Sequence, residues 1–145
     1  MKQEKALELF NSELNCAQSV FSVYAEDLHL DPSIAENMAC GFGAGMGKLQ
    51  KTCGAVTGSF MVLSMYNSQK TGNKKEQRNR TYAMIQTFHQ KFEKIHQTSE
   101  CKRLTNCDLN TPEGQKYAIE NNVFGTICEK CITDSIEILN ELMTE

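Results

Sequence analysis

The chain has 145 residues, only two of them prolines, and no serine- or glycine-rich linker, so we expect a single domain over residues 1–145 with an ordinary buried core. A formal net charge of −3 excludes the broadly basic surface that is typical of nucleic-acid-binding proteins. No segment reaches the roughly 18 apolar residues of a membrane span, and the first residues show no signal-peptide pattern, so we expect a cytoplasmic protein with no membrane or nucleic-acid partner.

Apolar residues recur three and four positions apart along most of the chain, which is the spacing of one face of an α-helix. The first segments with this spacing are residues 7–14 and 20–28. Asp31 precedes Pro32, and an N-cap residue followed by proline at the first helical position predicts a helix that continues through residue 38.

Residues 41–58 hold six of the nine glycines, which raises the question of a phosphate-binding loop. A P-loop would need glycine in place of Phe42 and serine or threonine in place of Leu49. A dinucleotide-binding fingerprint fails at Met46 or at Lys48, depending on the starting glycine, and it would follow a strand rather than a predicted helix. We therefore interpret the glycines as conformational, allowing positive φ angles and close backbone approach.

Cys53 follows the glycine run directly before a predicted buried helix, residues 55–66. Thr52 or Cys53 is expected to cap this helix, and a thiol there gains from the helix dipole, which favours the thiolate. A face of small residues follows, made of Gly54, Ala55, Gly58 and Ser59. This face lets another helix or a bulky inorganic group come close to the backbone, although tight helix packing around an inert thiol explains the same residues.

Residues 73–98 form the longest predicted helix. Its expected apolar face consists of Tyr82, Ile85, Phe88, Phe92 and Ile95. Ser99 is expected to cap a short turn that carries Cys101 and Leu104.

Thr111 before Pro112 repeats the combination of cap and proline and predicts another helix. A last helix, from about residue 126 to 142, turns four side chains inward: Ile127, Ile132, Ile136 and Leu139. No β-alternation of useful length occurs. The predicted fold class is all-α, a single-domain bundle-like fold of five to seven helices.

Seven cysteines are many for a chain expected in a reducing compartment. Structural disulfides rarely persist there, so thiols in this number indicate metal binding or redox chemistry. An odd count also means that intrachain disulfides cannot pair all of them.

Several motifs of the chain occur together in one family. They are Asn15-Cys16-Ala17-Gln18, the stretch GFGAGMG at 41–47, the stretch CGAVTG at 53–58, Cys101, the stretch DLNTPEG at 108–114, and Cys128. With these motifs the chain resembles, over nearly its whole length, the small prokaryotic C_GCAxxG_C_C family of redox-active proteins. The family name writes Gly-Cys at its centre, whereas this chain reads Cys53-Gly54.

The family's four cysteines fall on Cys16, Cys53, Cys101 and Cys128 of this chain. The resemblance implies an all-α domain whose four thiols converge on one redox site. Related domains in split-Soret-type cytochromes are associated with an iron–sulfur cluster, so the resemblance also implies a [2Fe–2S] cluster with four thiolate ligands. Such clusters accept Cys₄ ligation, and the glycines around Cys53 would offer backbone N–H groups to the sulfurs.

The chain departs from the family pattern in having Cys40, Cys107 and Cys131 as well. We expect these three to pack as small apolar side chains, although Cys131 also forms a CxxC pair with Cys128 and could share a metal or a dithiol couple with it. Spacing alone also allows a Cys₄ zinc site made of Cys101, Cys107, Cys128 and Cys131.

Three functions remain open from the sequence. The four cysteines carry electrons through a cluster, or they cycle between thiol and disulfide with Cys53 as the nucleophile, or zinc stabilises a helical binding module without redox chemistry. Either redox function implies a redox partner protein, which the sequence does not identify. The oligomeric state is open, with a homodimer as one option.

Overall fold

The computed structural model describes residues 1–144. This part of the chain is helical and contains no β-strand, only an isolated bridge between Thr52 and Glu100. In chain order the elements are α1 (Lys2–Phe10), α2 (Cys16–Val23), α3 (Pro32–Ala39), the 3₁₀ turn η1 (Cys40–Phe42), α4 (Gly54–Ser68), α5 (Lys74–His96), α6 (Cys101–Thr105), α7 (Pro112–Glu120), the π-helical segment η2 (Phe124–Cys128) and α8 (Glu129–Leu142).

The predicted all-α class is confirmed, but the predicted number of helices is too low. Residues 1–144 contain eight α-helices instead of five to seven. One reason is α6, which the sequence predicts only as a short turn. Asn106 adopts the left-handed conformation with φ 57° directly after Thr105 and closes this five-residue helix.

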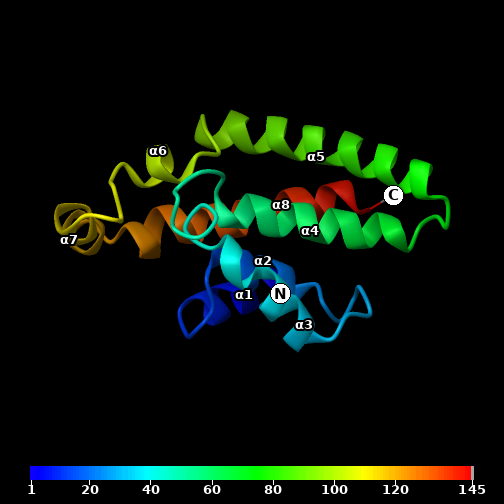
Figure 1. The fold of residues 1–145 in the computed structure, drawn as a ribbon, viewed down its shortest axis with the longest axis horizontal. Helices are drawn as coiled ribbons and strands as arrows, with labels where there is room; N and C mark the ends of the chain where they lie inside the picture. The colour runs from blue at the N-terminus through cyan, green and yellow to red at the C-terminus, as the bar shows by residue number, and fades with distance from the viewer. Residues whose placement is uncertain (145) are drawn as a thin grey trace.

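The long helices α4, α5 and α8 lie side by side (Figure 1). Helix α1 packs on α8, α2 packs on α4 and α8, and α3 packs on α2. Helix α2 also packs on α1 and so links α1 and α3 to the long helices. Helices α6 and α7 gather with the loop before α4 at one end of the molecule, on the left in Figure 1. This end carries the candidate site.

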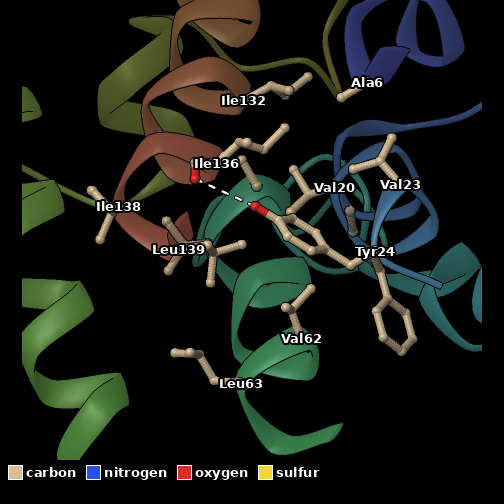
Figure 2. Close-up of a cluster of buried hydrophobic side chains, with 14 of the residues drawn as sticks. Ala6, Val20, Val23, Tyr24, Val62, Leu63, Ile132, Ile136, Ile138 and Leu139 are labelled. Carbon is tan, nitrogen blue, oxygen red and sulfur yellow. Dashed lines mark hydrogen bonds between the residues drawn. The ribbon is translucent and has the colours of Figure 1, made fainter. Parts of the chain in front are cut away.

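The main core lies between α2, α4 and α8. Figure 2 shows Val20, Val62 and Ile136 from these helices within the same cluster of buried side chains. Fully burying an aliphatic side chain of this size contributes about 1.5–3 kcal/mol. Tyr24 brings a hydroxyl into the cluster, where it donates to Asn140 Oδ1 at 2.7 Å and lies 3.4 Å from the Ile136 carbonyl oxygen.

Two of the predicted helix starts are confirmed by their caps. The Asp31 carboxylate accepts from the Ser33 N–H at 2.9 Å, and the Thr111 hydroxyl accepts from the Gly114 N–H at 3.0 Å. Proline follows each cap at the first helical position. The spacing over 20–28 is helical only to Val23, because the buried residues after it lie in successive turns.

The predicted apolar face of α5 is partly wrong. Tyr82 and Ile95 are 58% and 46% exposed, and the buried residues of the helix are Thr81, Met84, Phe88 and Phe92. Thr81 is the polar residue that replaces Tyr82 on this face, and its hydroxyl donates to the Gln77 carbonyl at 2.7 Å. Backbone bonding within the helix therefore allows a threonine where the sequence predicts an aromatic residue.

Ser99 does not cap α6, contrary to prediction. The N-cap is Glu100, without a side-chain cap, and the Glu100 N–H donates to Thr98 Oγ1 at 3.1 Å. Ser99 instead connects elements, because its hydroxyl contacts His89 Nε2 at 3.2 Å and its carbonyl accepts from the Cys53 N–H at 2.7 Å.

Within residues 1–144, no helix has the combination of length and apolar character that crossing a membrane requires.

Candidate functional site

The glycine loop, residues 41–51, folds back on itself before α4. The Gln50 N–H donates to the Ala44 carbonyl at 3.1 Å, and the Lys51 N–H donates to the Gly45 carbonyl at 2.9 Å. Gly45 has φ +70°, and a Cβ on it would come within 2.7 Å of the Gln50 Cα and the Cys101 Cβ. Only glycine fits this position, so the conformational interpretation of the glycine run is confirmed here.

Backbone hydrogen bonds join the end of this loop to the start of α6. The Cys101 N–H donates to the Lys51 carbonyl at 2.6 Å, and the Lys102 N–H donates to the Gln50 carbonyl at 3.2 Å. Together with the bond from Cys53 to Ser99, they hold Cys53 and Cys101 near each other although 48 positions separate them.

The buried side chain of Gln50 completes this connection. Its amide nitrogen donates to Thr105 Oγ1 at 3.2 Å and to the Cys107 carbonyl at 3.0 Å, and its oxygen accepts from the Leu109 N–H at 2.8 Å. It also hydrogen-bonds the Cys101 sulfur. Gln50 thus fixes one site cysteine and the chain that follows α6.

Cys16 is the first residue of α2, and the cap of this helix positions it. Asn15 and Gln18 form a capping box, with both hydrogen bonds at 2.9 Å. The Asn15 amide also donates to the Cys40 carbonyl at 2.9 Å and so ties α2 to the start of the glycine loop. In the motif Asn-Cys-Ala-Gln, the asparagine before the cysteine and the glutamine after it therefore both have structural roles.

The small-residue face of α4 receives helix α2, as one of the two sequence interpretations expected. A Cβ on Gly58 would lie 2.7 Å from the Ala17 carbonyl oxygen, and a Cβ on Gly54 would collide with Cys16 Sγ. Cys53 is the N-cap of α4, as predicted, although its side chain makes no capping hydrogen bond. Close packing of the two helices brings Cys16 against the beginning of α4.

The last two cysteines of the site come from the C-terminal helices. Cys128 ends the π-helical segment η2, and Cys131 lies one turn later in α8. π-helical turns within longer helices are frequent at functional sites.

These elements enclose a cavity of about 80 Å³ with five cysteines on its wall: Cys16, Cys53, Cys101, Cys128 and Cys131. We call it the cysteine cavity. Its other lining residues are Phe10, Ala44, Gly54, Leu104, Thr105, Leu109, Phe124 and Ile127. The structure therefore brings together all four cysteines assigned from the family resemblance and adds Cys131 to them.

The other two cysteines do not line the cavity. Cys40 is exposed, and Cys107 is half-buried against the small cluster of Leu109, Ala118 and Val123. All seven cysteines of the chain are free thiols.

Burial and mutual proximity raise the pKa of the cavity thiols. Burial is the main cause for Cys16, whose pKa rises to about 11, and for Cys101, whose pKa rises to about 12. The neighbouring Cys53 thiol adds to both shifts. The pKa of Cys128 is raised for the same reasons.

The sequence predicts that the helix start favours the thiolate form of Cys53, but the structure favours the protonated thiol. Backbone N–H groups of Ala55 and Val56 do bond its sulfur and lower its pKa. A hydrogen bond with the Cys131 thiol and burial outweigh them and raise the pKa well above its ordinary value. Without a bound group, the cavity therefore holds protonated thiols at neutral pH.

The donor types of the cavity fit an iron–sulfur cluster, although the side chains that line it are not arranged around a metal position. All its ionisable lining groups are thiols, which are soft ligands that select iron–sulfur clusters, zinc and Cu(I). Within residues 1–144, no group of three or more His, Cys, Asp or Glu side chains is arranged to hold a metal ion. A [2Fe–2S] cluster takes four cysteines in all, and the cavity offers five.

The fold and this cavity define a small all-helical protein with a cysteine-rich centre. The chain belongs to the family described as "Putative redox-active protein (C_GCAxxG_C_C)", whose model matches residues 14–142. The resemblance read from the sequence motifs is thereby confirmed. Over 126 residues the chain is 29% identical to an uncharacterized protein of Archaeoglobus fulgidus, and the match covers 81% of this chain and 83% of the relative. No solved structure matches the chain.

Sequence reasoning missed Gln50 and undervalued Cys131. Gln50 lies in a polar stretch, where nothing in the pattern signals a buried amide. For Cys131 the signal was present, because Cys128 and Cys131 stand three positions apart and so share one side of a helix.

Proposed function

We propose that this protein is an electron carrier in which Cys16, Cys53, Cys101 and Cys128 hold a [2Fe–2S] cluster. The observation that carries the proposal is that these four family cysteines come from α2, the start of α4, α6 and η2 and yet line the same apolar cavity. When bound, such a cluster supplies a centre that accepts and releases electrons.

The chain's own groups would tune this centre. Ala44 N–H bonds the Cys16 sulfur, Ala55 N–H bonds the Cys53 sulfur, and Gln50 bonds the Cys101 sulfur. Hydrogen bonds to sulfur and burial are the means by which a protein sets the potential of a cluster. The aromatic and aliphatic lining gives the sulfurs a mostly apolar environment.

Protonation couples to loading of the site. Thiols must lose their protons to act as ligands, and burial raises their pKa values here. Loading therefore releases protons, and we expect it to become more favourable as pH rises from neutral towards the thiol pKa values.

The test is a panel of single Cys→Ser variants purified without oxygen and analysed for iron, zinc and visible absorption. We expect brown wild-type protein with an iron charge-transfer band, and loss of the band in the Cys16, Cys53, Cys101 and Cys128 variants. Cys40→Ser is the matched control and should keep it, because Cys40 is exposed and lies outside the cavity. Circular dichroism should show that the helices survive in each variant.

Three results would contradict this proposal. Zinc without iron would favour the structural-site alternative, and a band that persists in Cys53→Ser would mean that the site is assigned wrongly. Protein with neither metal would favour thiol–disulfide chemistry, for which the hydrogen bond between Cys53 and Cys131 is the supporting observation.

A further inference from the structure

The cysteine cavity contains one thiol more than a four-ligand cluster uses. Cys131 is 1% exposed and is hydrogen-bonded to Cys53, which is 8% exposed. Both side chains line the same cavity. The two thiols are therefore already in contact, although 78 positions separate them in the chain.

The packing of α4 on α8 fixes this contact. Cys53 is the N-cap of α4, and its N–H donates to the Ser99 carbonyl at 2.7 Å. Cys131 lies in α8 next to Ile132, which is fully buried in the main core, and α4 and α8 pack on each other. Neither backbone is part of a loose loop, so the proximity of the two thiols is built into the fold.

We propose that Cys53 and Cys131 form a reversible intrachain disulfide that withdraws Cys53 from the four-cysteine centre. The pairing itself rests on the position of both thiols in one cavity, on helices that pack against each other. Its regulatory effect rests on the proposed function, because it assumes that Cys53 is a ligand. Oxidation then leaves three of the four ligands and favours loss of the cluster, and reduction restores all four.

The oxidant is hydrogen peroxide, which is small enough to enter the cavity of about 80 Å³ when no cluster fills it. Cys53 first loses its proton to water, its thiolate attacks one peroxide oxygen, the O–O bond breaks, and the released hydroxide combines with that proton to give water. The Cys131 sulfur then attacks the Cys53 sulfenic acid, the S–S bond forms, and the second water leaves with the Cys131 proton. Overall, two thiols and one peroxide give one disulfide and two waters.

The order of these steps follows from exposure. Cys53 is the more exposed of the two, so it meets the oxidant first, and the almost fully buried Cys131 resolves the intermediate. A small dithiol reverses the reaction by thiol–disulfide exchange and becomes oxidised itself.

The chain offers a direct test by peptide mapping, because trypsin separates the relevant cysteines. Cys53 is the only cysteine between Lys51 and Lys70, and Lys130 divides Cys128 from Cys131. Metal-free, reduced, full-length protein is treated with one equivalent of hydrogen peroxide, its remaining thiols are alkylated, and the digest is analysed by mass spectrometry. We expect peptide 52–70 linked to peptide 131–145, and release of both by a dithiol.

Two outcomes overturn the pairing. One is a link from peptide 52–70 to any other cysteine peptide. The other is that Cys53 and Cys131 stay free, or Cys53 oxidises further, when excess peroxide has been added. Because the wild-type chain is used, neither outcome depends on a variant that folds poorly.

The regulatory part is tested on protein loaded with iron, with Cys131→Ser compared with wild type and with Cys40→Ser. We expect Cys131→Ser to lose its iron several-fold more slowly under peroxide than wild type does, each rate being taken relative to the iron that the same protein holds before treatment. Equal rates of iron loss in all three proteins overturn the regulation. If the wild type holds no iron at all, the proposed function fails, while the peptide map still decides the disulfide.

Discussion

At the residue scale, the site depends on a glutamine as much as on cysteines. Gln50 spans the glycine loop, α6 and the chain after α6 with a single amide group. Its backbone is in the left-handed region with φ 56°, and its side chain is buried. The burial of Gln50 depends on the conformation of the loop, so no residue pattern in the sequence predicts it.

We predict that Gln50→Leu destabilises the protein by about 1–3 kcal/mol, because it leaves the buried Leu109 N–H without an acceptor. Leucine is close to glutamine in size, so the loss reports hydrogen bonding more than packing. Denaturant unfolding measures it. The exposed Gln86→Leu is the control and should change stability by less than about 0.5 kcal/mol. Equal stability of the two variants would contradict the role given to Gln50.

The cysteine residues show what sequence can and cannot predict at this scale. The resemblance to a family named the four cysteines that the structure brings to one cavity. It could not decide about Cys131, because its contact with Cys53 depends on how α8 packs against the start of α4.

At the element scale, the approach of α2 to α4 positions two of the cysteines. Gly58 lies where the Ala17 backbone crosses α4, and backbone atoms cannot yield as a flexible side chain can. The sequence indicated a face of small residues on α4, and the structure identifies the helix that uses it. The face of α5 was harder to predict, since tertiary packing buries Thr81 and leaves Tyr82 outside.

We predict that Gly58→Ala destabilises the protein by about 1–3 kcal/mol, because the added Cβ would stand 2.7 Å from the Ala17 oxygen. Alanine is favoured over glycine within a helix by about 1 kcal/mol, so a net loss would show that the clash dominates. Thermal unfolding measures the effect, with Gly72→Ala as the control at a position where a Cβ meets nothing within 4 Å. A stabilised Gly58→Ala would mean that α2 and α4 are not held at this distance.

At the scale of the whole molecule, the cavity couples stability to pH. The folded pKa values of Cys16 and Cys101, about 11 and about 12, lie above the ordinary value of 9.0. The folded state therefore holds these protons more tightly than the unfolded state does. The free energy of unfolding therefore has its full value below pH 9 and decreases as pH rises through the folded pKa values of the two thiols.

We predict that the metal-free, reduced protein unfolds at a lower urea concentration at about pH 10.5 than at about pH 8. Unfolding in the absence of oxygen measures the difference. Cys101→Ala should show a smaller loss than wild type, because it lacks one of the shifted groups, and Cys40→Ala should show the wild-type loss. If Cys101→Ala and Cys40→Ala respond equally to pH, the cavity thiols are not the cause.

The sequence was most informative at this largest scale. Helical spacing and the absence of β-alternation were enough for the all-α class, because both depend on local pattern alone. The cavity could not be predicted from local patterns, because residues from α2, α4, α6, η2 and α8 together form its wall.

The most direct test of the central claim is the amount of iron and acid-labile sulfide per chain in protein purified without oxygen. The account predicts about two of each, as in a [2Fe–2S] cluster, together with visible absorption that disappears in Cys53→Ser. Iron-free protein, or protein whose iron is unchanged in Cys53→Ser, would contradict it.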